Sequence, residues 1–166
     1  PFYKIWNNKA LRILILILLL SAIFPLLAHR YSLAKDSVGG DGRDPARYRE
    51  AAQWLAQNTP GSLVYTSDWD DFPELFFYNS KNKYLIGLDP AFMYKKNKAL
   101  FETWVSLNQG KATCDVYDLF LKTFKTIYLF TDYNHPEFIS MVERTEGIEL
   151  AYGDRYARIY RLLPRK

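Results

Sequence analysis

The first thirty residues contain a continuous apolar run. No charged residue occurs from Ile13 to Ala28, and extending the run back to Ala10 brings it close to the roughly 20 residues that cross a bilayer as a helix. Arg12 lies inside this extension, but its long side chain can place the charge at the interface. The run is apolar on every face, which is untypical of a soluble helix. Residues 1–30 are therefore predicted to be a transmembrane helix with its flanks.

The flanks of the run indicate its orientation. Lys4, Lys9 and Arg12 place more positive charge on the N-terminal side, as is typical of a cytoplasmic flank. Aromatic residues of the kind found at membrane interfaces precede the run: Phe2, Tyr3 and Trp6. We expect the N-terminus to lie in the cytoplasm and the following domain to lie outside.

Three interpretations of the run remain open. We favour the last span of a longer multi-spanning protein, and the alternatives are a single-pass anchor and a cleaved signal peptide. Ser32-Leu33-Ala34 offers a cleavage site of small residues, although the apolar run is longer than the usual signal core. The polar, glycine-rich segment KDSVGGDGR then predicts a linker over residues 31–43.

Residues 44–166 alternate between helical and strand patterns. Asp44-Pro45 is a helix-start signal, and an apolar stripe at helical spacing follows it up to about Asn58: Tyr48, Ala51, Ala52 and Leu55. Asp89-Pro90 repeats this signal for a helix that ends before Gly110. Shorter helices are expected over 115–124 and 136–145.

Short β-rich runs separate these helices. Strands are predicted over 63–66, 84–88 and 127–131, and a hairpin joins 148–152 to 157–162. This alternation predicts an α/β domain over residues 44–166. We expect three layers, with a mainly parallel sheet of about five strands and an antiparallel C-terminal hairpin.

Charge and cysteine content narrow the function. The chain has 22 basic and 18 acidic residues, and four of the basic residues lie in the first thirty, where no acid occurs. The remaining 18 bases balance the 18 acids, so the domain lacks the basic excess typical of nucleic-acid binding. The single cysteine, Cys114, excludes an intrachain disulfide and a CxxC metal site, and it is interpreted as a small core residue.

Acidic residues follow each of the first three predicted strands. Asp68, Asp89 and Asp132 come directly after them, and parallel strands place their carboxyl ends at one edge of the sheet. Further acidic and aromatic residues could share this edge: Trp69, Asp70, Asp71, Tyr94 and Tyr133. Carboxylates beside aromatic rings suit a sugar or a sugar-bearing lipid, and a divalent cation is a second possibility.

These acids also have a structural interpretation. Asp89 and either Asp70 or Asp71 can cap helices, and Asp132 can form an Asx turn before Pro136. Lys95, Lys96 and Lys98 are expected to form a solvated face or to touch anionic lipid headgroups.

The common catalytic signatures are absent from the sequence. GxSxG, GxGxxG and GxxxxGK[ST] do not occur, and His29 and His135 have no partners at metal-ligand spacing. The sequence therefore predicts no catalytic residue, metal or cofactor.

The order of these segments resembles a known class of membrane protein. A terminal span followed by YREAAQWLAQNTP, SDWDDFPELFFYN and KYLIGLDPAFMY is similar to the C-terminal extracytoplasmic domain of bacterial multi-spanning proteins that resemble C-type glycosyltransferases, the group that includes the protein mannosyltransferase-like enzymes. The likeness covers roughly residues 48–110. It implies a bacterial inner or plasma membrane, a polyprenyl-phosphate sugar donor, and a catalytic acid in a membrane region upstream of these residues.

Two functions follow as expectations. The resemblance implies an accessory domain that helps to hold the acceptor beside a membrane-embedded active site, with Asp68, Trp69, Asp70, Asp71, Asp89, Tyr94 and Asp132 as candidate binding residues. The alternative is a non-catalytic, membrane-anchored module that binds a protein or a cell-envelope polymer.

Overall fold

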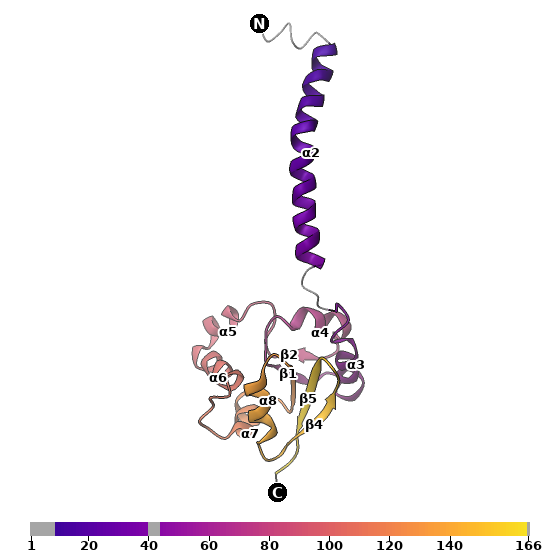
Figure 1. Ribbon diagram of the computed structural model, residues 1–166. Coiled ribbons are helices and arrows are strands. Elements are labelled where there is room, and N and C mark those ends of the chain that lie inside the picture. The colour runs from indigo at the N-terminus through magenta and orange to yellow at the C-terminus, as the bar shows by residue number, and fades with distance from the viewer. Residues whose placement is uncertain (1–8, 40–43, 166) are drawn as a thin grey trace. The chain divides into compact units, whose positions relative to one another are not determined.

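The computed structural model describes residues 9–39 and 44–165 (Figure 1). The chain divides into two compact units, one ending at Asp44 and the other beginning at Pro45. The expected domain, residues 44–166, is close to the second unit. The aromatic residues and Lys4 that were expected at the membrane interface lie outside the described residues.

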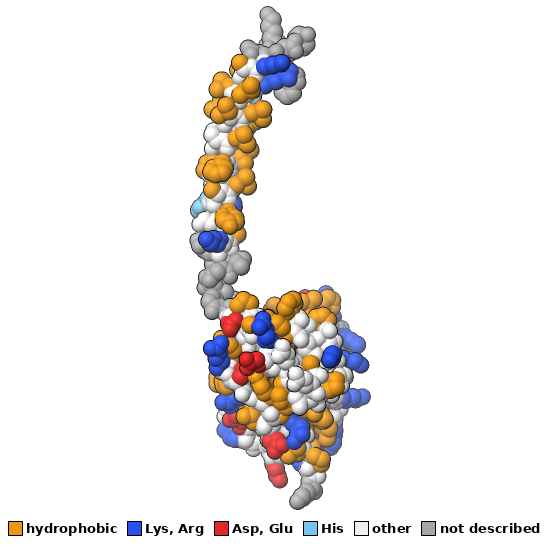
Figure 2. Space-filling view, turned by 90° about the vertical axis from the view of Figure 1, so that its right-hand side faces the viewer, with side chains coloured by type: hydrophobic (Ala, Val, Ile, Leu, Met, Phe, Trp, Pro, Cys, Tyr) orange, Lys and Arg blue, Asp and Glu red, His pale blue; other side chains and the backbone are white. Residues whose placement is uncertain are grey.

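The first unit contains the helix α2, which runs from Lys9 to Gly39 and includes Pro25. Its apolar side chains are exposed, and basic side chains lie near both ends of the apolar part (Figure 2). Among the described residues, the segment Lys9–Lys35 is the one helix long and apolar enough to cross a membrane, and a signal sequence meets the same criteria. The helix covers residues 31–39 of the expected linker because residues 31–38 contain no proline or glycine. Residues 40–43 lie outside the described part.

The second unit is built on an open five-stranded sheet. Its strands are β1 (Leu63–Thr66), β2 (Lys83–Tyr84), β3 (Tyr128–Asp132), β4 (Ile148–Gly153) and β5 (Ala157–Leu162). They lie in the order β2-β1-β3-β5-β4. The pairs β1–β2 and β1–β3 are parallel, whereas β3–β5 and β4–β5 are antiparallel.

The expected mixture of helices with a five-stranded sheet is confirmed, as is the C-terminal hairpin. Two of the four strand pairings are parallel and two are antiparallel, so the sheet is not mainly parallel. The two antiparallel pairings are the one between the hairpin strands β4 and β5 and the one between β5 and β3. The second strand is also shorter than predicted, since pairing with β1 stops at Tyr84.

Helices surround the sheet. They are α3 (Arg49–Asn58), α4 (Phe72–Tyr78), α5 (Ala91–Lys96), α6 (Lys98–Asn108), α7 (Val116–Asp118), the π-helix η1 (Leu119–Thr123) and α8 (Pro136–Glu143). The first of them ends at Asn58 as expected but begins at Arg49, because the residues after Pro45 form a turn. The helix expected after Asp89-Pro90 is divided at Asn97, whose side chain accepts a hydrogen bond from the Leu100 amide and caps α6.

Alternate strand residues belong to two core clusters, as the two-residue period of a strand requires. Tyr65 and Leu129 pack with residues of α6, η1 and α8, whereas Val64 and Phe130 pack with residues of α3 and α4. Each of these four side chains is fully buried. The short central strands are therefore held by helix packing, with about 1.5–3 kcal/mol for each large buried side chain.

The edges of the sheet are irregular. The edge strand β2 contains two residues, and the other edge strand, β4, has a register shift between Leu150 and Tyr152 where it pairs with β5. Such a bulge adds a residue on one strand and increases its local twist.

The turn after α6 requires glycine. Gly110 has a φ of +64°, and a Cβ added there would lie 3.0 Å from the Glu137 carbonyl oxygen. Gly110→Ala is therefore expected to lower the free energy of unfolding by about 2–3 kcal/mol, through backbone strain and the clash with α8. Gly61→Ala is the matched control, since Gly61 has a φ of +80° and open space around it, and should cost about 1 kcal/mol. Urea unfolding of both variants measures the difference, and equal losses would contradict the clash.

Candidate functional site

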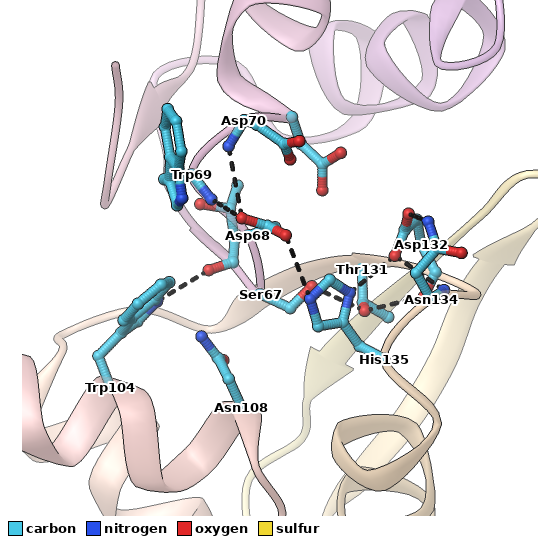
Figure 3. Close-up of polar contacts among 12 residues, drawn as sticks. Ser67, Asp68, Trp69, Asp70, Trp104, Asn108, Thr131, Asp132, Asn134 and His135 are labelled. Atoms are coloured by element: carbon cyan, nitrogen blue, oxygen red, sulfur yellow. Dashed lines mark hydrogen bonds and ion pairs between the residues drawn. The ribbon is translucent and has the colours of Figure 1, made fainter. Parts of the chain in front are cut away.

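The carboxyl ends of β1 and β3 meet at one edge of the sheet, where His135 joins them. Its Nδ1 lies 2.7 Å from Oδ1 of Asp132, and its Nε2 lies 3.4 Å from Oδ2 of Asp68. Figure 3 shows the imidazole lying between the two acids. Of the three predicted strand-end acids, the structure therefore brings Asp68 and Asp132 to one site.

Asp132 is the centre of a buried hydrogen-bond network. Its Oδ2 accepts hydrogen bonds from the Tyr48 hydroxyl, 3.3 Å away, and from the Asn134 amide group. Its Oδ1 accepts one from the backbone N–H of Asn134 at 3.0 Å, which forms the expected Asx turn. A carboxylate with this many donors is satisfied although the residue is buried.

Ion pairing and hydrogen bonding shift the pKa values of His135, Asp68 and Asp132. Hydrogen bonds to Asp132 and Asp68 raise the pKa of His135 to about 10, so the imidazole is protonated at neutral pH. The hydrogen bond to His135 in turn lowers the pKa of Asp68. Burial acts to raise the pKa of Asp132, but the hydrogen bond and charge of His135 outweigh it, and the pKa is lowered. The three groups form a carboxylate–imidazolium–carboxylate bridge between β1 and the turn after β3.

A further acid, Asp71, is buried beside this bridge. Its Oδ1 lies 3.8 Å from the Arg47 guanidinium, and its Oδ2 is buried without a hydrogen-bond partner. Burial raises the pKa of Asp71 to about 7, and the negative charge of Asp132 adds to this increase. Asp71 precedes α4, but its side chain makes no capping hydrogen bond, so the expected capping role is wrong for this residue.

A cavity of about 340 Å³ lies next to the bridge. Its lining residues come from the loop after β1, from the residue before α5, from α6 and its C-terminal end, and from the loop before α8: Ser67, Asp68, Trp69, Pro90, Trp104, Val105, Asn108, Gln109 and His135. Trp104 is fixed by a hydrogen bond from its indole Nε1 to the Thr66 carbonyl, whereas the Trp69 ring is 41% exposed. The cavity therefore combines one exposed indole with carboxylate and amide groups (Figure 3).

The other predicted residues lie outside the bridge. Asp70 is exposed, and its backbone N–H points to the Asp68 carboxylate at 3.5 Å. Asp89 accepts a hydrogen bond from the Ala91 amide at the start of α5, which agrees with its structural interpretation. Tyr94 packs edge-on against Phe101, and Tyr133 donates its hydroxyl to the Asp154 carbonyl.

Metal binding finds no support in the described part of the chain. Within residues 9–39 and 44–165, no group of three or more His, Cys, Asp or Glu side chains is arranged to hold a metal ion. Cys114 is exposed, so its interpretation as a core residue is wrong; it lies in the loop between α6 and α7.

Sequence reasoning missed three residues of the site. His135 was set aside for lack of metal-ligand spacing, yet its position three residues after Asp132 is a signal for a local ion pair. Tyr48 was expected only as an apolar helix residue, and Arg47 gave no signal, because its partner Glu74 lies 27 residues away along the chain.

The chain was compared with protein-family models, curated proteins and solved structures, and none of them matches it, so its function has to be inferred from the residues of the site.

Proposed function

We propose that this chain is the C-terminal extracytoplasmic part of an integral membrane glycosyltransferase-like protein, in which the α/β domain binds the glycan acceptor or the headgroup of a polyprenyl-phosphate sugar. α2 anchors the domain, and the helices on the two core clusters make a three-layer unit around the sheet. The observation that carries the proposal is the 340 Å³ cavity, which combines an exposed indole with Asp68, Asn108 and Gln109.

The chemistry of these groups suits a sugar. A carboxylate accepts hydrogen bonds from hydroxyl groups, and a side-chain amide can both donate and accept them. The face of an indole ring contacts the apolar C–H surface of a sugar ring without requiring one particular stereochemistry. A concave site with a few polar groups beside an aromatic ring is the usual form of a small-ligand site.

The bridge supports a binding role rather than a catalytic one. Both nitrogens of His135 are held by carboxylates, and its pKa is raised to about 10. An imidazole that stays protonated at neutral pH has no free lone pair with which to act as a general base. The bridge instead fixes the carboxylate of Asp68 at the cavity wall, where it can accept a hydroxyl hydrogen bond.

The test is a titration of the full chain in nanodiscs with glucose, mannose, N-acetylglucosamine and a polyprenyl-phosphate sugar analogue. Binding is expected to shift the NMR signals of Trp69 and Asn108. Trp69→Ala should weaken binding about tenfold, the effect of losing roughly 1.4 kcal/mol of aromatic contact. Leu150→Ala, which removes an exposed apolar side chain on β4 outside the cavity, is the control and should leave the affinity unchanged. No shift at millimolar ligand, or equal affinities for all three proteins, would overturn the proposal.

A further inference from the structure

Large apolar side chains are exposed on α4, on α5 and in the loop before α5. Phe77 and Phe92 are 80% and 72% exposed, and Phe76 and Leu88 are also exposed. We call these four residues, together with Lys95 and Lys96, the α4–α5 surface. Single exposed apolar residues are ordinary, but a contiguous group of this kind marks a contact with another apolar phase or partner.

A cavity connects the two helices of this surface. It has a volume of about 560 Å³ and its wall is mainly apolar, with Phe72, Leu88, Phe92 and Met93 among the lining residues. The ring of Phe72 stacks on that of Phe76, with ring centroids 5.3 Å apart. The exposed ring of Phe76 is therefore continuous with the cavity beside α5.

The α4 part of this surface lies beside the residues at which the chain enters the domain. The Tyr78 hydroxyl, in the last residue of α4, donates a hydrogen bond to the carbonyl of Pro45, the first residue of the domain. Only five residues of chain separate Pro45 from Gly39, the end of α2. A helix that crosses a bilayer is therefore joined to this end of the domain by a short segment of chain.

The charges beside the apolar residues are suited to anionic lipid. Lys95 and Lys96 are exposed in the last turn of α5, and no acid of the described chain pairs with them. The nearby Lys98 pairs with Glu102 at 3.6 Å, and the Asp89 carboxylate is engaged at the start of α5. Two cations are therefore left for lipid phosphates, and a Lys near an anionic membrane surface strengthens binding to it.

We infer that the α4–α5 surface rests on the anionic lipid bilayer that α2 crosses. Its aromatic and leucine side chains enter the boundary between headgroups and acyl chains, and Lys95 and Lys96 contact phosphate groups. This contact fixes the orientation of the domain on the membrane. The inference requires the membrane anchoring in the proposed function but is independent of sugar binding.

Spin-label accessibility in the full chain tests this contact. Cys114→Ser removes the native thiol, and a nitroxide is then attached in turn through Phe92→Cys, Leu150→Cys or Leu18→Cys. The label at position 150, on the exposed side of β4, reports water, and the label at position 18, in α2, reports the bilayer core. Collisions with oxygen, which concentrates in hydrocarbon, are compared with those of a water-soluble nickel chelate in nanodiscs of phosphatidylglycerol or phosphatidylcholine.

In phosphatidylglycerol nanodiscs, the ratio of oxygen collisions to nickel-chelate collisions is expected to be several-fold higher at position 92 than at position 150. In phosphatidylcholine nanodiscs, this difference between the two positions should be smaller. Lys95→Glu with Lys96→Glu should abolish the difference. Lys111→Glu with Lys122→Glu, the same charge change near α7 at the other end of the domain, should not (Figure 1).

Three results would overturn the inference. Equal ratios at positions 92 and 150 would mean that the surface faces water although α2 is inserted. Protection of position 92 from both reagents would indicate a protein partner or a second copy of the chain. A water-like ratio at position 18 would show that α2 is not inserted, which would also remove the anchoring in the proposed function while leaving the sugar titration as a separate test.

Discussion

Asp132→Ala is expected to lower the free energy of unfolding by about 3–5 kcal/mol, the usual cost of removing one partner from a buried ion pair. The substitution removes the acceptor of the Tyr48 and Asn134 hydrogen bonds and leaves the His135 imidazolium with Asp68 alone. Urea unfolding of the full chain in detergent, followed by near-UV circular dichroism, measures the loss.

Two further variants make this result specific. Asp132→Asn keeps the shape and one acceptor oxygen but removes the charge, so it should lose less than Asp132→Ala. Asp118→Ala breaks an exposed ion pair with Lys122 in an i,i+4 arrangement and should cost less than about 0.5 kcal/mol. If Asp132→Ala lost no more than this control, the bridge would have no role in stability.

Between about pH 4 and pH 7, Asp71 is expected to make the domain less stable as the pH rises. Burial raises the pKa of Asp71 from 3.8 to about 7, so in this range the carboxyl is protonated in the folded state and ionised in the unfolded chain. The folded state then binds more protons, and the free energy of unfolding falls with increasing pH. The difference between these pKa values corresponds to roughly 4 kcal/mol.

Asp71→Asn isolates this contribution, because the amide does not titrate. The pH dependence of unfolding should therefore be flatter in the variant, with a wild-type-minus-variant difference that falls by roughly 4 kcal/mol between pH 4 and pH 8. Asp118→Asn, a substitution of an exposed acid outside the bridge, is measured in parallel as the control. Parallel curves for wild type and Asp71→Asn would show that Asp71 titrates normally and is not buried as described.

The carboxylate–imidazolium–carboxylate bridge makes two other contributions to the pH dependence of the free energy of unfolding. The pKa of His135 is raised to about 10, so its stabilisation is complete below its ordinary pKa of 6.5 and is lost as the pH rises through 10. Asp68 and Asp132 have lowered pKa values, so their stabilisation is present above the ordinary carboxyl pKa of 3.8 and is lost as the pH falls below it. These slopes remain in Asp71→Asn, and subtraction of the two curves removes them.

Much of the fold could be predicted because its signals are local. The alternation of short β-rich runs with amphipathic stretches predicted the five strands and most of the helices. The errors occurred where long-range pairing or a single side chain decides the outcome. Asn97 divides one expected helix by capping the next, and β2 ends where its pairing with β1 ends.

The site was only partly predictable. Of the three acids expected at one edge of the sheet, Asp68 and Asp132 meet because β1 and β3 are parallel neighbours, whereas Asp89 lies at the start of α5. One hydrogen-bond partner of Asp132 comes from a distant segment, since Tyr48 lies 84 residues from Asp132 in sequence. Strand order, which periodicity does not encode, determines whether such residues meet.

The irregular edges of the sheet have a consequence for copies of the chain that the proposed membrane anchor would confine to one bilayer. Confinement to two dimensions raises local concentration, and an unpaired strand edge is then a template for association between neighbouring copies. A two-residue β2 offers few free backbone groups, and the bulge in β4 interrupts the regular ladder that an incoming strand would need. Crowded copies of this domain can thus lie side by side without extending one another's sheets into fibrils.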